Sequence, residues 1–203
     1  MWLVENSLHN QDIHILINRI KTAPKILILG SPGSGKSYFS VILGKHLRIP
    51  VYHLDDMYWE EGWKRPHDSV FHASVQDILS KDRWILEGNY HKYLLRERIH
   101  AADLVIMMQA PVLLCELRML GRWVKVALGD VGTLPEKIKN NTYRKRDRNH
   151  LDVAILKLIL DFGNKICPII YQHIKESGHE KVIFLNRRLV KTLDSFLMSE
   201  ARR

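Results

Sequence analysis

Residues 30–37 read GSPGSGKS, which matches the spacing G-x-x-x-x-G-K-S. An apolar run, KILIL at 25–29, comes directly before this motif, and a stretch with helical spacing follows it. The run has the length and the branched side chains of a buried parallel strand. A strand, a glycine-rich turn of this spacing and a helix form the context that a phosphate-binding loop, or P-loop, requires. The sequence therefore predicts a P-loop at 30–37.

The motif gives a physical role to its main chain and to two of its side chains. Glycines let the backbone turn tightly, so that successive N–H groups form a nest for an anion, and the following helix adds the positive end of its dipole. Lys36 can reach the β- and γ-phosphates of a nucleotide, and the Ser37 hydroxyl can ligate Mg²⁺. We therefore predict ATP and Mg²⁺ as cofactors. The expected nucleotide-binding residues are Gly30, Ser31, Pro32, Gly33, Ser34, Gly35, Lys36, Ser37 and Tyr38.

The composition is that of a globular protein. Of the 203 residues 46% are hydrophobic, and no apolar run approaches the length of a membrane span. The amino end lacks the basic region and apolar core of a signal peptide, and the two cysteines, Cys115 and Cys167, are far apart. We expect a cytoplasmic protein with reduced thiols and no membrane contact. The net charge of +9 suits polyanions, a class that includes both nucleotides and nucleic acids.

Strand-like and helix-like stretches alternate along the chain. The expected strands are 25–29, 51–54, 84–87, 104–108 and 181–185. This alternation predicts a mostly parallel sheet with helices on both faces. An extra helix should precede the first strand, because apolar residues there follow i, i+3, i+4, i+7 spacing, at Ile13, Leu16, Ile17 and Ile20. We therefore divide the chain into an N-terminal helical appendage, 1–23, and a P-loop domain, 24–203.

Acidic side chains follow two of the expected strands. The carboxyl ends of parallel strands meet at one edge of the sheet, where ligands bind. Asp55 or Asp56 could hold Mg²⁺ through water or accept a proton from a substrate hydroxyl, or could simply cap the segment that follows. Glu87 could orient the water shell of Mg²⁺ or pair with an arginine. The predicted edge therefore collects the P-loop, Asp55, Asp56, Glu87 and Gln109.

Two further groups of side chains could serve phosphate transfer. Arg118 and Arg122 are four residues apart and share a helix face, and guanidinium forks suit phosphate oxygens. Together with the basic run up to residue 148 they suggest a cationic lid over 118–150, although basic segments are also ordinary solvated loops. Stacking and polar groups for an acceptor, or for a packed aromatic loop, come from Tyr58, Trp59, Trp63, Arg65 and His67.

The strings HLDDMYW at 53–59, Gly62-Trp63 and WILEGNY at 84–90 resemble the bacterial topology-modulation (FlaR-like) family. That family is similar to adenylate kinases and other small P-loop kinases. The resemblance implies a five-stranded parallel sheet in the order 2-3-1-4-5, binding of ATP and Mg²⁺, and a lid. The segment 55–58 is also similar to the Asp-x-Phe-Tyr of uridine kinases, where the aspartate is the base, which favours Asp55 over Asp56. Departures from the family pattern are Gln109, Tyr38 and Glu87.

These observations predict an α/β protein with the three-layer P-loop NTPase fold of the nucleotide-kinase type and an extra N-terminal helix. The expected activity is an ATP-dependent phosphotransfer to a small acceptor, a nucleoside or nucleoside monophosphate, by a monomer or homodimer. The alternative is a nucleotide-binding protein that modulates DNA topology, and a third reading is a P-loop protein that binds ATP without catalysis. The expected catalytic residues are Lys36, Asp55, Arg118 and Arg122. The expected metal site is Ser37, Asp55 and Glu87.

Overall fold

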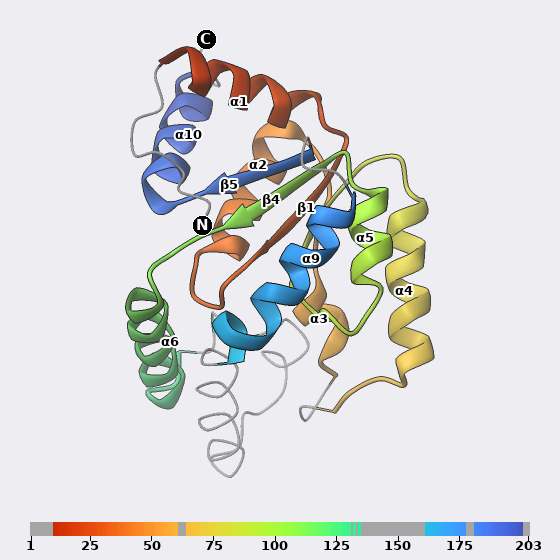
Figure 1. Ribbon diagram of the computed structural model, residues 1–203. Helices are drawn as coiled ribbons and strands as arrows, with labels where there is room; N and C mark the ends of the chain where they lie inside the picture. The colour runs from red at the N-terminus through yellow and green to blue at the C-terminus, as the bar shows by residue number, and fades with distance from the viewer. Residues whose placement is uncertain are drawn as a thin grey trace.

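The computed structural model describes residues 10–60, 64–130, 132, 134, 161–177 and 181–200. In these ranges one parallel sheet of five strands has the order β2-β3-β1-β4-β5, which confirms the predicted topology. Its strands β1, β4 and β5 lie side by side in Figure 1. The strands are β1 (Lys25–Gly30), β2 (Val51–His53), β3 (Trp84–Glu87), β4 (Leu104–Met108) and β5 (Val182–Leu185). No helix in the described part of the chain is long and apolar enough to cross a membrane.

The central strand β1 explains why the sheet is buried on both sides. Ile26 and Ile28 belong to one apolar cluster, whereas Leu27 belongs to a second cluster on the opposite face. Successive side chains of a strand point to opposite faces, so an unbroken apolar run requires cover on both. In register, Ile28 pairs with Glu87 of β3 and with Ile106 of β4.

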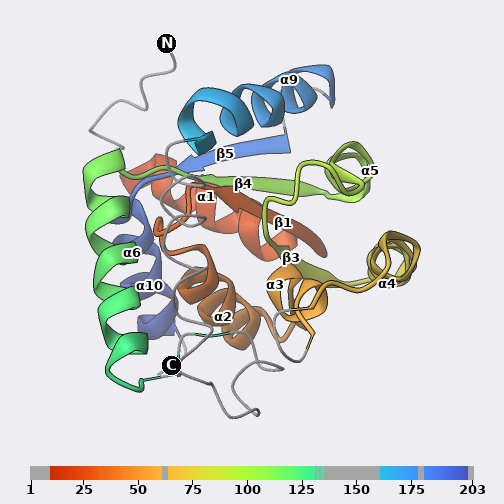
Figure 2. The same ribbon diagram turned by 90° about the horizontal axis from the view of Figure 1, so that it is seen from below.

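Helices supply this cover in two layers (Figure 2). One face packs on α1 (Asn10–Thr22), α2 (Lys36–Leu47) and α10 (Arg187–Glu200). The other face packs on α3 (Leu54–Tyr58), α4 (Asp68–Ser80), α5 (Leu95–Ala101) and α9 (Cys167–Ser177), which continues the π-helical turn η3 (Phe162–Ile166). The helix α6 (Val112–Ala127) follows β4 and extends past the carboxyl ends of the strands (Figure 1). The chain therefore has the predicted three-layer fold.

The N-terminal helix α1 packs directly on this core. Leu16, Ile17 and Ile20 are buried in the same apolar cluster as Ile26 of β1. The helix is therefore continuous with the packing of the sheet. The division of the chain at residue 23 stays a prediction.

The structure differs from the sequence prediction at the end of the second strand. The expected strand 51–54 ends at His53, and Leu54 begins the short helix α3. Leu54 is fully buried, and its Cβ lies where a side chain on Gly88 would otherwise point. Acidic residues favour the first turn of a helix, and α3 has Asp55 and Asp56 there. A helix of five residues is too short to show a helical period in the sequence.

Candidate functional site

The loop between β1 and α2 has a backbone that needs its glycines. Gly30, Gly33 and Gly35 have φ values of 141°, 78° and 99°, which favour glycine. A Cβ on Gly30 would lie 2.3 Å from the Met108 carbonyl oxygen, and one on Gly33 would lie 2.7 Å from that of Cys115. The loop therefore packs so closely on β4 and α6 that only glycine fits at these two positions.

The loop presents donors suited to an anion. The first amides of α2 have no partner within the helix, and the positive end of its dipole faces the same point. The hydroxyl oxygen of Ser34 is buried and has no hydrogen-bond partner in the described part of the chain. An unsatisfied buried hydroxyl costs free energy unless a ligand completes its bonding. The loop therefore fits a polyphosphate.

Lys36 and Ser37 begin α2 and both reach toward β3. The Lys36 ammonium donates a hydrogen bond of 3.1 Å to the Ser31 carbonyl oxygen and lies 3.8 Å from Glu87 Oε1. The Ser37 hydroxyl donates to Glu87 Oε2 over 3.0 Å. A hydroxyl and a carboxylate in contact provide the hard oxygen ligands that Mg²⁺ prefers, with nucleotide phosphates and water completing the shell. These residues therefore fit the predicted metal.

Glu87 is the centre of this polar cluster. Its Oε2 also lies 3.0 Å from His53 Nδ1, because His53 and Glu87 end neighbouring strands and pair directly in register. Burial raises the pKa of the Glu87 carboxyl, but the hydrogen bond with His53 and the charge of Lys36 outweigh it and hold the pKa below its ordinary value. The hydrogen bond to Glu87 raises the pKa of His53. Glu87 is therefore an ionised carboxylate at neutral pH.

Asp55 lies in the first turn of α3, directly after β2. Its Oδ1 accepts a hydrogen bond of 2.6 Å from the Tyr90 hydroxyl. Asp55 is exposed to solvent, yet the protein atoms around its carboxyl raise its pKa, with the charge of Glu87 adding to this and the hydrogen bond from Tyr90 opposing it. A carboxylate with a raised pKa is a better proton acceptor near neutral pH. Asp56 is half-buried on the same turn.

The two arginines of α6 lie near different parts of this polar cluster. Arg118 Nη1 donates a hydrogen bond of 2.8 Å to the Gly33 carbonyl oxygen. Burial lowers the pKa of the half-buried Arg122, and the charges of Asp55 and Glu87 oppose this shift. The predicted helix face therefore brings one guanidinium onto the P-loop and the other into the field of both carboxylates.

Three residues that sequence reasoning did not single out complete the site. The side-chain amide of Asn89 forms two hydrogen bonds with the main chain of Gly30. Asn89 Oδ1 accepts from the Gly30 N–H over 3.0 Å, and Asn89 Nδ2 donates to the Gly30 carbonyl oxygen over 2.8 Å. Tyr90 holds Asp55, and His53 holds Glu87. The strings 53–59 and 84–90 contain all three, so their place at strand ends was the available signal.

Other predicted residues lie farther from this cluster or outside the described residues. The Tyr38 side chain is exposed, and its hydroxyl lies 3.5 Å from Asp194 Oδ2 on α10. Gln109 donates to the Tyr171 hydroxyl over 3.2 Å. The Arg65 guanidinium lies 5.5 Å from the ring centres of both Tyr58 and Trp59. Trp63 and the predicted lid beyond residue 134 lie outside the described residues.

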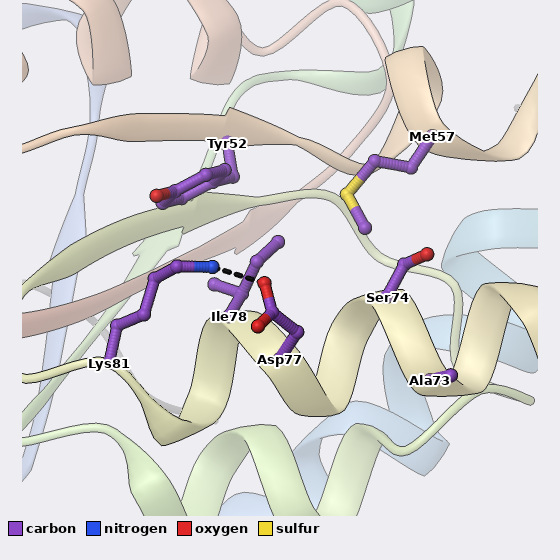
Figure 3. Close-up of a pocket in the computed structure, with 7 residues that line it drawn as sticks. All are labelled: Tyr52, Met57, Ala73, Ser74, Asp77, Ile78 and Lys81. Atoms are coloured by element: carbon purple, nitrogen blue, oxygen red, sulfur yellow. Dashed lines mark hydrogen bonds and ion pairs between the residues drawn. The ribbon is translucent and has the colours of Figure 1, made fainter.

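An open pocket of about 470 Å³ lies between β2 and α4, apart from this cluster (Figure 3). It is lined by Tyr52, Met57, Ala73, Ser74, Asp77, Ile78 and Lys81, and an ion pair joins Lys81 to Asp77. None of its lining residues belongs to the P-loop or to the carboxylates described above. Within the described ranges no three His, Cys, Asp or Glu side chains gather as a metal site. This pocket is therefore separate from the polar cluster at the P-loop edge.

Comparison with known proteins agrees with the fold. The structure is similar to that of a shikimate kinase from Acinetobacter baumannii in complex with shikimate, with a TM-score of 0.54, 17% identity, and coverage of 91% of this chain and 96% of that chain. A shikimate kinase from Bacteroides thetaiotaomicron gives a TM-score of 0.51 and 12% identity over 90% of this chain and 100% of that chain. No family model and no curated protein matches the sequence. At these identities the likeness shows the P-loop kinase fold alone, and the resemblance to the topology-modulation family stays a prediction.

Proposed function

We propose that this protein is an ATP-dependent phosphotransferase that moves the γ-phosphoryl group to a small acceptor. One observation carries the proposal: a phosphate nest and two carboxylates from neighbouring strand ends share one edge of the sheet, with Lys36 between the loop and Glu87. Phosphoryl transfer needs positioning and neutralisation of charge more than covalent chemistry. This cluster offers both.

The donor side rests on the loop and the first turn of α2. Its amides and the Ser34 hydroxyl would bind phosphate oxygens, and Lys36 would leave the Ser31 carbonyl to reach the β- and γ-phosphates. Ser37 and Glu87 would hold Mg²⁺, with Asp55 as the third member of the metal site, through water. Bound there, the metal would neutralise charge on the phosphates. Arg118 and Arg122 would add positive charge from α6.

The acceptor side rests on Asp55. With a nucleoside as acceptor, its hydroxyl oxygen would form the new bond to the γ-phosphorus while the bond from that phosphorus to ADP breaks, and the hydroxyl proton would pass to the Asp55 carboxylate. With a nucleoside monophosphate, an unprotonated phosphate oxygen would form that bond, and Asp55 would orient the acceptor. The raised pKa of this carboxyl suits a base that works near neutral pH. The resemblance to nucleotide and uridine kinases favours a nucleoside or a nucleoside monophosphate as acceptor. The two structural neighbours, both named shikimate kinases, support the kinase class.

The test is ADP release from ATP and Mg²⁺ in a screen of nucleosides and nucleoside monophosphates. Lys36→Ala should abolish turnover while the thermal unfolding of the protein stays unchanged. Lys45→Ala is the matched control, because Lys45 is exposed on the same helix and away from the loop. Equal turnover in wild type and Lys36→Ala would refute the proposal.

The second candidate is a nucleotide-binding protein that modulates DNA topology with little or no kinase activity. The net charge of +9 and the family resemblance favour it. Phosphate contacts make such binding steeply dependent on salt. A DNA gel-shift titration at two salt concentrations separates the candidates. Tight binding at physiological salt, together with no ADP release for any acceptor, would select the second one.

A further inference from the structure

Arg98 is a fully buried charged residue on α5. Its guanidinium makes four hydrogen bonds, and each described partner is a main-chain carbonyl oxygen. Nη1 donates to Gly88 over 2.8 Å, Nη2 donates to Asn89 over 2.6 Å and to Tyr90 over 2.9 Å, and Nε donates to Leu94 over 3.4 Å. Three of these four acceptors belong to the loop that follows β3. Arg98 therefore binds three successive carbonyl groups of this loop, residues 88–90.

A guanidinium in this place is costly. Burial lowers the pKa of Arg98 to about 9, which leaves the group charged at neutral pH. An apolar side chain of similar volume would avoid the desolvation of a charge. It would not bind three carbonyl oxygens that point inward, and buried carbonyl groups without partners are themselves unfavourable. The planar fork of arginine satisfies all of them at once.

The loop 88–90 depends on these hydrogen bonds because the backbone of Tyr90 is strained. Gly88 has a φ of 137°, and Tyr90 has a φ of 32°, in a region that residues other than glycine rarely adopt. Strained backbone persists where the surrounding contacts over-determine it. The carbonyl groups that Arg98 binds belong to Gly88, to Asn89 and to the strained residue Tyr90.

The same loop touches both halves of the proposed reaction site. The Asn89 side chain binds the N–H and the carbonyl of Gly30, the first residue of the P-loop. The Tyr90 hydroxyl binds Asp55, the proposed base. Fixing the main chain at 89 and 90 therefore fixes the phosphate-binding loop and the acceptor carboxylate relative to each other.

We propose that Arg98 is a positioning residue: by binding the carbonyl groups of Gly88, Asn89 and Tyr90, it sets the geometry between the P-loop and Asp55. The proposal rests on the function proposed above for that site. Arg98 itself is fully buried and would touch neither the expected nucleotide nor the acceptor. It acts through Asn89 on the donor side and through Tyr90 on the acceptor side. Misplacement by about 1 Å can reduce an enzymatic rate on the order of 10²-fold.

The first arm of the test does not need catalysis. Arg98→Lys keeps a positive charge but loses the fork, and amide hydrogen exchange is compared with that of the wild type. We expect faster exchange at Gly30, whose N–H is bound by Asn89, while the central amides of β4 stay protected. Arg96→Lys is the control, because Arg96 is exposed on the same helix. Unchanged exchange at Gly30 in a folded Arg98→Lys protein overturns the proposal.

The second arm measures phosphotransfer with the acceptor found in the screen. In Arg98→Lys we expect kcat to fall about 10- to 100-fold. KM for ATP should change less than kcat, since both substrates still bind but in poor alignment. An equal loss in the Arg96→Lys control, or an unchanged kcat in Arg98→Lys, contradicts the proposal. A wild type that shows no turnover refutes the proposed function instead, and the exchange measurement then decides the role of Arg98 by itself.

A second variant leaves Arg98 in place, so that the proposal can be tested even if Arg98→Lys does not fold. Asn89→Ala removes the link from the loop to Gly30 without uncovering the guanidinium. It should accelerate exchange at Gly30 as Arg98→Lys does, and the two changes combined should add little further. Unchanged exchange at Gly30 in Asn89→Ala, or full additivity in the double variant, means that Arg98 does not act through this loop.

Discussion

The Tyr90 hydroxyl donates a hydrogen bond of 2.6 Å to Asp55 Oδ1 and so joins the loop after β3 to the helix after β2. This bond and the other groups around the carboxyl shift its pKa in opposite directions. The protein atoms around the carboxyl and the charge of Glu87 raise the pKa of Asp55, whereas the bond from Tyr90 lowers it. A carboxylate accepts several hydrogen bonds, so an acceptor hydroxyl can bind Asp55 while Tyr90 stays in place. Tyr90 therefore tunes the proposed base.

The first prediction concerns the pH dependence of activity. Tyr90→Phe removes a bond that favours the ionised carboxylate, so the pKa of Asp55 should rise further. The base is inactive when protonated, and the acid limb of kcat/KM should therefore move to higher pH. Activity relative to wild type should fall more at pH 6 than at pH 8. A pH profile that coincides with the wild type would exclude Asp55 as the titrating base.

The matched control for this change is Tyr93→Phe. The Tyr93 hydroxyl donates to Asp68 over 3.1 Å, and the Tyr93 ring centre lies 5.6 Å from that of Tyr58 and 6.4 Å from that of Tyr90. Loss of this hydroxyl should leave the acid limb in place, because it makes no bond to Asp55. A shift of the same size in both variants would indicate that the aromatic packing, and not the hydrogen bond of Tyr90, controls the limb.

The second prediction concerns stability and the pair of His53 with Glu87. The pKa of His53 in the folded protein is raised above 6.5, mainly by the hydrogen bond to Glu87. The contribution of a raised histidine is fully present below its unfolded pKa and is lost as pH rises through the folded pKa. His53→Gln should therefore destabilise the protein more at pH 5.5 than at pH 9, by about 1 kcal/mol.

Urea unfolding of His53→Gln and wild type at both pH values measures this difference. His100→Gln is the control, because His100 is exposed on α5. His100→Gln should change the free energy of unfolding by the same amount at pH 5.5 and at pH 9. If His53→Gln lowers the free energy of unfolding equally at pH 5.5 and pH 9, the histidine is not charged in the folded state. Lys36 is then the cation that stabilises the Glu87 carboxylate.

The third prediction separates two glycines of the P-loop. Both Gly30 and Gly35 have positive φ, but a Cβ on Gly30 would collide with the Met108 carbonyl, whereas no atom lies within 4 Å of one on Gly35. Gly35→Ala should cost about 1–2 kcal/mol from backbone strain alone. Gly30→Ala should cost more, because β1 and β4 must also separate. Denaturant unfolding compares the two variants, and an equal loss would mean that the loop adjusts without moving β4.

Sequence reasoning predicted those features that depend on local pattern. The motif at 30–37 and the apolar runs indicate the P-loop and the strands, and helical spacing places Arg118 and Arg122 on one face. The order of the strands came from a family resemblance. Contacts between distant segments carry no such signal. Asn89 and Gly30 are 59 residues apart, and His53 and Glu87 are 34 apart, so only the folded sheet brings them together.

Arg98 shows the same limit more sharply. An arginine in a short, polar helical stretch is most often a solvated surface residue. Nothing in the sequence indicates that α5 turns this side chain into the core, where the carbonyl groups of 88–90 point inward. The strain at Tyr90 that creates the need for a clamp is likewise a property of the backbone in three dimensions. The role of such a residue can be inferred only from its contacts in the folded structure.

The last prediction concerns Arg118, whose guanidinium binds the Gly33 carbonyl over 2.8 Å. In the proposed reaction this guanidinium would neutralise charge on the transferred phosphoryl group, and removal of one such donor typically costs on the order of 10²-fold in kcat. Arg118→Ala should show that loss, and Arg118→Lys should restore little, because a point charge cannot bind the loop and a phosphate together. Lys125→Ala, exposed on the same helix, should be neutral. If kcat is unchanged in folded Arg118→Ala, Arg118 has only a structural role, in which it connects α6 to the loop.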